Sequence, residues 1–403
     1  MTIVINGTTG ISGVDGSAAT PAVQGADTNT GVFYPAADTI AFSEGGVEAM
    51  RIDSSGNLLV GTTSASTPST TGYISVANTF GFKNRLINSA MVIDQRNAGA
   101  SGTASGYNID RWVFGATLTT KGTWQQNAGS VTPPTGFKNY LGFTSNSAYT
   151  PLTGDVFSFY QVIEGFNCAD LMWGTANAQT VTVSFWVRSS LTGTFGGALS
   201  NTTRSNPFSY TISSANTWEQ KTVTVTGDTS GTWNSTNGQG IFLFMTFGAG
   251  STYQGTAGTW ATADYRTVTG AVNTVGTNGA TFYITGVQLE KGSTATSFDY
   301  RPYGTELALC QRYYYRFTKS LGLSYTNSTP LDRVQYPVTM RSTPTLDSSN
   351  NSYAVGGGSA GTVAVYNQTG APLTTDAAYF YNSASNWTAG NLTAVTAGLS
   401  SEL

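Results

Sequence analysis

The stretch Phe282–Phe317, FYITGVQLEKGSTATSFDYRPYGTELALCQRYYYRF, holds in order the local patterns from which this chain is built. It begins with Phe282 and Ile284 in alternation with other residues, which is typical of a strand with one buried face. An extended polar arm follows. Thr305 then suits the N-cap of a helix, and the helix dipole favours an acidic residue such as Glu306 in the first turn. The stretch therefore predicts a strand, an arm, a short helix and a tyrosine-rich strand.

The composition extends the strand pattern to the whole chain. Its 403 residues include 48 Gly, 12% aromatic residues and only 10% charged residues, with a formal net charge of -3. Disorder usually accompanies high net charge and few aromatic residues, so the chain is expected to fold. Strand-forming residues dominate between Gly and Asn turns, and Glu and Lys, which favour long helices, are scarce. The predicted fold class is all-β.

The same composition argues against several classes of protein. No Lys/Arg cluster is present to meet the phosphates of a nucleic acid. The longest strongly apolar run, 241–245, is far shorter than the ~20 residues that cross a bilayer, so no membrane insertion is expected. The start MTIVINGTTG lacks the basic flank and apolar core of a signal peptide, which favours assembly in a cytoplasm or export by another route. Cys168 and Cys310 are then expected to be free, buried thiols.

Residues 1–62 are predicted to form an N-terminal module of short hairpins. Alternating strands at 39–42, 47–52 and 58–60 are separated by turn-forming residues. Each strand holds too few apolar residues to bury a core within one copy. Other copies of the chain then supply the missing face, or the segment is a flexible tail with incidental hairpins. Residues 63–83 are predicted to form a Ser- and Thr-rich linker.

Residues 84–303 are predicted to form a β-sandwich. Between residues 181 and 187 apolar and polar residues alternate, which directs Trp186 away from its valine neighbours. The run 241–247 is apolar on both faces, as in a central strand that is covered on each side. Two Gly-, Thr- and Asn-rich passages are predicted to be loops at one end of the sandwich: 191–206 and 248–280.

Residues 304–403 are predicted to form a smaller C-terminal β-domain. Strands are expected in four segments: 313–317, 334–338, 362–366 and 377–381. The last residues, which end in Ser401-Glu402-Leu403, carry no helix or strand pattern.

The sequence lacks the residues of most catalytic sites. It has no His, which excludes Ser-His-Asp and Cys-His relays and His-based zinc sites. No glycine-rich nucleotide motif is present. Cleavage of a polysaccharide by paired carboxylates stays open, with Asp155, Glu164 and Asp170 as candidates by position. Because Asp and Glu total only 21 residues, most are expected to serve turns and solvated edges, and the chain is predicted not to be an enzyme.

Sugar binding is the chemistry that the composition favours. Aromatic faces stack on the apolar faces of sugars, and amide and guanidinium groups bond their hydroxyls. The candidate residues are Trp186, Trp218, Trp233, Trp260, Tyr313 and Tyr315. The opposing interpretation is that these side chains pack at subunit interfaces or under loops. Asp110, Glu290 and Asp299 are candidates for a structural Ca²⁺, although their spacing is not that of an EF-hand, and no other cofactor is expected.

Five segments, in this order, resemble the distal part of tailed-bacteriophage tail-fibre and virion-fibre proteins. They are LINSAMVIDQRNAG (86–99), TVTVSFWVRSS (180–190), WEQKTVTVTGDTSGTW (218–233), VQLEKGSTATSFDYRP (287–302) and ELALCQRYYYR (306–316). The resemblance covers roughly Phe33–Thr62 and Lys83–Thr345. It implies a central jelly-roll β-sandwich of the carbohydrate-binding type, a small receptor-facing β-sandwich at the C-terminal end and assembly as an intertwined homotrimer.

The resemblance also implies a function. Residues 1–62 would attach to another virion protein of the tail, baseplate or adaptor, and residues 304–403 would be the tip that binds a host polysaccharide or lipopolysaccharide. The alternatives are a capsid head fibre or decoration protein, a polysaccharide depolymerase spike, and a bacterial surface adhesin. The chain departs from the family in its very short N-terminal unit and in having no coiled-coil shaft, which leaves the point of attachment open.

Overall fold

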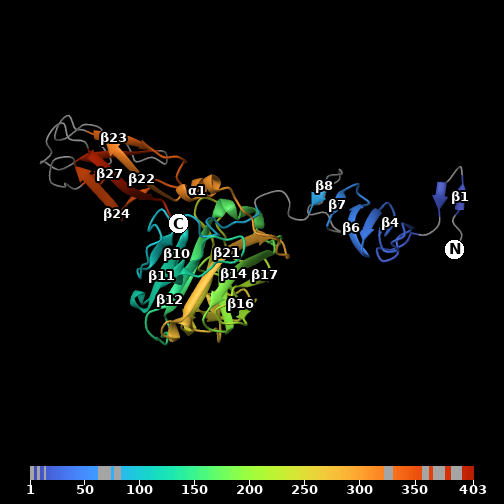
Figure 1. Ribbon diagram of the computed structural model, residues 1–403, viewed down its shortest axis with the longest axis horizontal. Coiled ribbons are helices and arrows are strands. Elements are labelled where there is room, and N and C mark those ends of the chain that lie inside the picture. The colour runs from blue at the N-terminus through green and yellow to red at the C-terminus, as the bar shows by residue number, and fades with distance from the viewer. Residues whose placement is uncertain are drawn as a thin grey trace. The chain divides into compact units, whose positions relative to one another are not determined.

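A computed structural model describes residues 4–6, 10–12, 15–61, 74–76, 83–321, 330–355, 363–365, 377–382 and 393–403. These residues form 27 strands and one α-helix, which confirms the all-β prediction. The chain divides into two compact units, Met1–Lys83 and Asn84–Leu403 (Figure 1). Within the described ranges, no helix is long and apolar enough to span a membrane.

The first unit contains a six-stranded sheet in the order β3-β4-β5-β6-β7-β8. Its strands are β3 (Val23–Gln24), β4 (Gly31–Phe33), β5 (Ile40–Glu44), β6 (Val47–Ile52), β7 (Leu58–Val60) and β8 (Ile74–Val76), and a separate hairpin pairs β1 (Val4–Asn6) with β2 (Gly10–Ser12). The predicted hairpin between β5 and β6 turns at Gly45 and Gly46, whose φ angles of 58° and 82° suit a two-residue turn. Of the predicted linker 63–83, only β8 and Lys83 lie among the described residues.

Two antiparallel sheets form the predicted sandwich. The six-stranded sheet has the order β16-β15-β18-β13-β10-β9, and the five-stranded sheet has the order β11-β12-β21-β14-β17. The strands are β9 (Gly106–Ile109), β10 (Trp112–Ala116), β11 (Gly122–Gln126), β12 (Leu141–Ser145), β13 (Val156–Glu164), β14 (Val181–Ser189), β15 (Gly193–Ser200), β16 (Ser205–Ile212), β17 (Glu219–Val225), β18 (Gln239–Ala249) and β21 (Thr281–Lys291). Short 3-10 turns lie at Thr119–Lys121, Ala128–Ser130, Gly165–Asn167, Ala169–Leu171, Ser251–Tyr253 and Thr274–Gly276.

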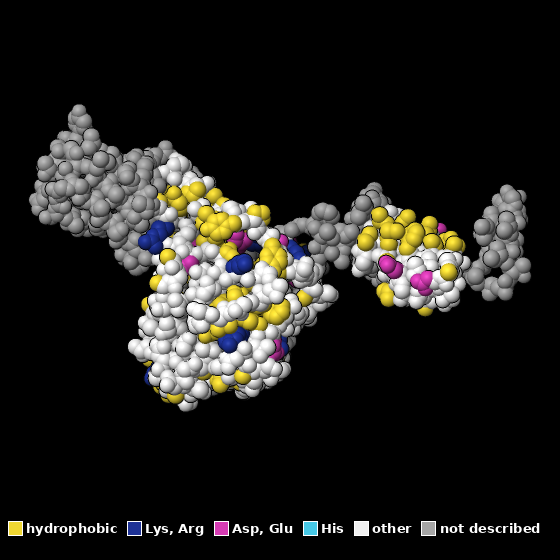
Figure 2. Space-filling view, viewed as in Figure 1, with side chains coloured by type: hydrophobic (Ala, Val, Ile, Leu, Met, Phe, Trp, Pro, Cys, Tyr) yellow, Lys and Arg dark blue, Asp and Glu magenta, His cyan; other side chains and the backbone are white. Residues whose placement is uncertain are grey.

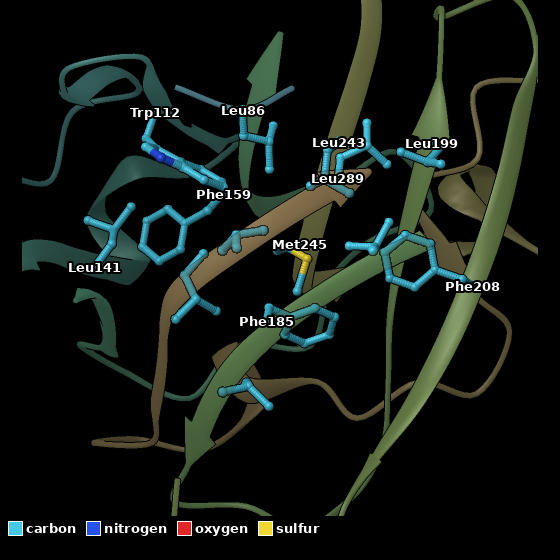
Figure 3. Close-up of a cluster of buried hydrophobic side chains, with 14 of the residues drawn as sticks. Leu86, Trp112, Leu141, Phe159, Phe185, Leu199, Phe208, Leu243, Met245 and Leu289 are labelled. Carbon is cyan, nitrogen blue, oxygen red and sulfur yellow. The ribbon is translucent and has the colours of Figure 1, made fainter. Parts of the chain in front are cut away.

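Apolar side chains from both sheets meet in one core (Figure 3). Phe185 and Leu289 come from the five-stranded sheet, and Phe159, Leu243 and Met245 come from the six-stranded sheet; all five are fully buried. Because alternate residues of a strand point to opposite faces, each strand contributes every second side chain to this layer.

The alternation predicted for β14 is confirmed. Val181, Val183, Phe185 and Val187 are fully buried in the core, whereas Trp186 points to the outer face and is only half-buried. The central strand is also confirmed: β18 pairs with β13 and β15, and the side chains from Ile241 to Phe247 are buried on both faces.

The passage 191–206 is not a loop as predicted, because it contains β15. This strand needs its glycines, since a Cβ at Gly196 would lie 2.3 Å from Thr267 Oγ1 and one at Gly197 would lie 2.3 Å from the carbonyl oxygen of Phe244. Close backbone approach therefore explains a composition that otherwise indicates a loop. The passage 248–280 is mostly irregular, with the end of β18 and the two-residue strands β19 (Gln254–Gly255) and β20 (Thr267–Val268).

The C-terminal part of the second unit forms two three-stranded sheets, β22-β27-β24 and β23-β26-β25. Their strands are β22 (Tyr314–Leu321), β23 (Pro330–Gln335), β24 (Thr345–Val355), β25 (Val363–Val365), β26 (Ala377–Asn382) and β27 (Thr393–Ser400). The helix α1 (Tyr303–Gln311) begins two residues before the predicted cap, with Pro302 as its N-cap and Glu306 in its first turn. No strand pattern predicted β27.

Candidate functional site

The strongest candidate site lies on the outer side of the five-stranded sheet, away from the core. Trp186 pairs with Gln220 on β17 and with Thr285 on β21, and Arg188 pairs with Tyr283. Residues that face each other across neighbouring strands project to the same face. Trp218, which immediately precedes β17, completes a surface that we call the outer aromatic face: Trp186, Arg188, Trp218, Gln220 and Tyr283.

Buried tyrosines support this surface from below. Tyr140 and Tyr283 are buried with their ring centroids 5.2 Å apart. The Trp218 ring meets Tyr140 nearly edge-on at 5.5 Å, and Trp218 Nε1 donates to the carbonyl oxygen of Thr132 at 2.9 Å. The Arg188 guanidinium lies 5.5 Å from the centre of the Tyr283 ring. These contacts hold the Trp218 indole and the Arg188 side chain in place.

The upper layer of the outer aromatic face is open to solvent. Trp186, Arg188 and Trp218 are half-buried, and Gln220 is exposed. In the space-filling view, hydrophobic side chains and a basic one lie together over the region where β14 and β21 run in Figure 1 (Figure 2). Aromatic rings can stack on a flat apolar ligand face, and the guanidinium and amide can bond its hydroxyls. The five residues that define the outer aromatic face include no carboxylate.

Trp233 and Trp260 lie elsewhere, in a cluster with Trp173. The three rings contact one another edge-on, with centroids 4.8 to 5.6 Å apart. Every indole N–H in the cluster donates to a protein acceptor, and the rings pack against the main core. The adjacent cavity of about 30 Å³ has room for a water molecule and not for a sugar ring. Trp218 is not part of this cluster, since its ring packs on Tyr140.

Tyr313 is fully buried and cannot contact a glycan. Its hydroxyl donates to Glu164 Oε2 at 2.5 Å, and the Arg111 guanidinium stacks on its ring at 3.6 Å. Burial raises the pKa of Tyr313, so its hydroxyl stays protonated and donates. The assignment of Tyr313 to a binding site is therefore wrong: it joins the sandwich to the C-terminal part.

Tyr315 does not form a joint surface with Tyr313. Tyr315 lies in β22 and is half-buried, with its ring 5.8 Å from Phe317 and 6.3 Å from Tyr336. Tyr313 precedes β22 and packs against Ile87, Ile93 and Cys310. The two tyrosines therefore belong to different packing clusters.

The three calcium candidates bond to protein groups. Asp110 is buried and accepts hydrogen bonds from the Gln95 backbone N–H at 2.7 Å and from Gln95 Nε2 at 2.6 Å. Glu290 accepts two bonds from Thr296, and Asp299 lies 3.5 Å from Arg301. Among the described residues no three acidic, Cys or His side chains gather as a metal site would require.

Glu290 and Gln288 instead fasten the arm that follows β21. Both point to the outer side of the five-stranded sheet and are fully buried. Gln288 Oε1 accepts a bond from the Asp299 backbone N–H at 2.9 Å, and Gln288 Nε2 donates to Glu290 at 2.9 Å. The buried polar groups of Gln288 and Glu290 thus find their hydrogen-bond partners in each other and in the arm.

The carboxylates considered for hydrolysis have separate partners. Asp155 accepts bonds from the Tyr149 hydroxyl at 2.5 Å and the Leu152 N–H at 2.8 Å. Asp170 forms a two-bond ion pair with Arg85. Glu164 is buried; this burial would raise its pKa, but hydrogen bonds from Arg312 and Tyr313 outweigh it and hold the pKa of Glu164 below its usual value.

The two cysteines are free and buried, as predicted. Burial raises the pKa of Cys168 to about 12 and that of Cys310 well above its usual value, so both stay as thiols.

Charged residues from distant parts of the chain meet where α1 and the C-terminal residues pack on the sandwich. Arg96 and Arg111 both pair with Glu402, and Arg312 forms a two-bond pair with Glu164. We call these five residues the charged junction. Arg96 and Arg111 stack on Tyr314 and Tyr313, each at 3.6 Å. Two of the segments that carry the family resemblance, 86–99 and 306–316, therefore contribute to packing here.

Two exposed aromatic residues of the arm and helix were not singled out from the sequence. Tyr300 and Tyr303 are 58% and 64% exposed, and the Tyr300 ring contacts Phe137 at a tilt and Phe298 edge-on. Tyr300 also borders a cavity of about 90 Å³. No periodic pattern in this arm indicated that these two side chains are exposed.

Comparison with known proteins gives structural likeness only. No family model and no curated protein sequence matches the chain. A tailspike protein 4 domain of bacteriophage CBA120 is 12% identical at a TM-score of 0.29, over 55% of this chain and 26% of that domain. A putative sugar-binding protein from Bacteroides thetaiotaomicron is 10% identical at a TM-score of 0.32, over 52% of this chain and 100% of that protein. The family 11 carbohydrate-binding module from Clostridium thermocellum is 12% identical at a TM-score of 0.26, over 49% of this chain and 100% of the module.

Proposed function

We propose that this chain is a non-enzymatic adhesion protein of a bacteriophage virion, a homotrimeric tail fibre that binds a host surface glycan. The observation that carries the proposal is the outer aromatic face, where half-exposed Trp186 and Trp218 lie beside Arg188 and Gln220. Stacking on aromatic rings with hydrogen bonds at the side is the usual chemistry of sugar recognition. A surface with few charges suits a polysaccharide better than a nucleic acid.

The glycan site of this proposal is on the sandwich and not on the C-terminal tip. Tyr313 is buried, and Tyr315 packs with Phe317 and Tyr336. Residues 304–403 then act as a packed extension of the sandwich, fastened by the charged junction.

The absence of catalysis in this proposal is supported by the state of the carboxylates. A hydrolytic pair needs one carboxylic acid and one carboxylate that both reach the same bond. Asp155, Glu164 and Asp170 each bond to different partners, and Glu164 is held ionised by Arg312 and Tyr313. Purified protein incubated with host envelope polysaccharide is expected to release no new reducing ends.

Substitution of Trp186 tests the binding surface. Trp186→Ala removes a half-buried ring without opening the core, so binding to purified host lipopolysaccharide or capsular polysaccharide should weaken by roughly tenfold or more. Trp186→Phe should retain part of the affinity. Biolayer interferometry with the immobilised polysaccharide measures both variants.

Phe166→Ala is the matched control, because this aromatic side chain is 60% exposed and lies in a different turn. It should bind like the wild type. Equal binding by Trp186→Ala, Trp218→Ala and the wild type, with the sandwich still folded, would remove the outer aromatic face as the site.

A further inference from the structure

The sheet of the first unit has one face on which apolar side chains predominate, with Glu44 at its end, beside the turn at Gly45 and Gly46. The backbone register aligns Val23, Val32, Phe42, Met50 and Val60 in one row across β3 to β7. A second row aligns Ile40, Ile52 and Leu58. Because paired residues of neighbouring strands point to the same side, these eight side chains form one surface. We call it the apolar face.

Among the described residues of this unit, none buries the apolar face. Val23, Ile40, Ile52 and Val60 are 58%, 41%, 40% and 39% exposed. The other four side chains of the apolar face are half-buried among their neighbours, and none of the eight is buried. Figure 2 shows hydrophobic side chains gathered along one side of this unit. A continuous exposed apolar surface marks an interaction site in a soluble protein.

The opposite side of the sheet differs in both burial and charge. Phe33, Ala41 and Leu59 are buried there, and they are the buried hydrophobic side chains among the described residues of this unit. Arg51 pairs in register with Ala41 and Leu59 and forms an ion pair with Glu48, so that these two charges lie on the side opposite the apolar face. The small core is thus on one side, and most of the apolar surface is on the other.

A core of three hydrophobic side chains is too small to stabilise a unit of this size, so the apolar face must be covered for the sheet to persist. The cover must itself be apolar and uncharged, because a charge facing this surface would lose its hydration without a partner. It must also be present wherever the chain folds. A second copy of the chain meets all three conditions, since the apolar face is complementary to itself.

We propose that the apolar face packs against the same face of other copies and forms the interior of the N-terminal part of the assembly. The inference rests on the homotrimer proposed above and assigns the surface that holds it together. Sheets that pack face to face interdigitate their side chains about 10 Å apart, which eight apolar side chains in two rows allow. Interfaces of obligate oligomers are accordingly the most hydrophobic class.

A charge placed in the centre of the apolar face tests the proposal in the full-length chain. Phe42→Lys should raise the dissociation constant of the oligomer by roughly 100-fold or more, because the ammonium group is buried in an apolar interface. Sedimentation velocity measures the oligomer, and the near-ultraviolet circular dichroism of the sandwich checks that the second unit stays folded. Ser54→Lys is the matched control, since Ser54 is exposed in the turn between β6 and β7.

Engineered cysteines give a second test that does not depend on unfolding. Both native cysteines are buried, so few disulfides between copies should form through them, and a disulfide formed by an added cysteine can be detected. Val60→Cys should form a covalent link between copies under mild oxidation, whereas Ser54→Cys should not. A wild-type oligomer that Phe42→Lys leaves intact and Val60→Cys fails to link would overturn the surface assignment while the homotrimer stands. A wild type that is monomeric at micromolar concentration would overturn both.

Discussion

The charged junction and the apolar face invert the usual distribution of side chains in opposite ways. In the junction Arg111 and Glu164 are almost fully buried, although both are charged. On the apolar face Val23 and Ile40 are exposed, although both are hydrophobic. The charges are buried because their partners, Glu402 and Arg312, belong to the same chain. The apolar side chains are exposed because the described part of their own unit does not cover them.

The stability of the two regions therefore depends on different surroundings. A buried ion pair is stable only while both members stay in place, since removal of one leaves the other charged and unpaired. An exposed apolar sheet gains stability from each neighbour that it binds, so its strength depends on protein concentration. The junction should therefore respond to point substitutions, and the N-terminal sheet should respond to assembly.

The largest effect is expected from breaking the junction at its centre. Arg111→Met removes the pair with Glu402, the bond to the carbonyl oxygen of Val162 and the stack on Tyr313. The free energy of unfolding of the second unit should fall by about 3–5 kcal/mol in urea titrations. Lys138→Met, at an exposed site, should change it by less than about 0.5 kcal/mol. A loss below about 1 kcal/mol for Arg111→Met would contradict the importance of the junction.

A core substitution in the N-terminal sheet should act on that sheet alone. Leu59→Ala creates a cavity on the buried side of the sheet and should cost about 2–5 kcal/mol of local stability. Hydrogen exchange followed by mass spectrometry should speed up in residues 23–60 and stay unchanged in β14 and β18, because the two units are separate compact bodies. Equal acceleration in β18 would show that the two units unfold together.

A substitution in the arm after β21 should lower the free energy of unfolding by less than Arg111→Met does. Thr296→Val removes the bond from Thr296 Oγ1 to Glu290 at 2.7 Å, and a hydrogen bond to a charged group is worth about 1.5–3 kcal/mol. Urea titration should show a loss in this range. Thr294→Val, at an exposed site of the same arm, should be near neutral. If Glu290 instead held Ca²⁺, a chelator would lower the melting temperature of the wild type; we expect no change.

A further prediction concerns the pH dependence of stability. Burial raises the pKa of Asp110 to about 7, against 3.8 ordinarily, and the charge of Arg96 and the hydrogen bonds from Gln95 only partly offset this rise. The folded state therefore keeps a proton that the unfolded state has lost, and this residue makes the protein less stable as pH rises from about 4 to 7. Asp110→Asn keeps an acceptor for Gln95 and should remove that contribution.

Melting temperatures between pH 4.5 and 7.5 measure this contribution. The stability of Asp110→Asn relative to the wild type should increase with pH across the interval. A constant difference would mean that Asp110 is ionised in the folded protein throughout.

The binding surface was only partly predictable from the sequence. Alternation around Trp186 identified its outward direction, because in a strand that direction follows from the backbone alone. The same logic failed for Tyr313, which precedes β22 and has its partner Glu164 at the end of β13. A contact between residues 149 positions apart leaves no periodic trace in either segment.

A high glycine content likewise did not distinguish a loop from a strand. The passage around Gly196 and Gly197 has the composition of a loop, yet it forms a strand in which Thr267 and Phe244 approach the backbone closely. Composition cannot distinguish glycine that bends a chain from glycine that lets another segment approach it.

By itself, the sequence determined the all-β class, the strands β5, β6, β7 and β14, and the outward direction of Trp186. These depend on interactions between residues only a few positions apart. Tertiary structure alone decided which polar and aromatic side chains are covered: Tyr313 is buried against residues that are distant in the sequence, Glu290 is buried where the following arm folds back, and Trp186 keeps part of its surface exposed. Direction is a local property of the backbone, whereas burial depends on what packs above it.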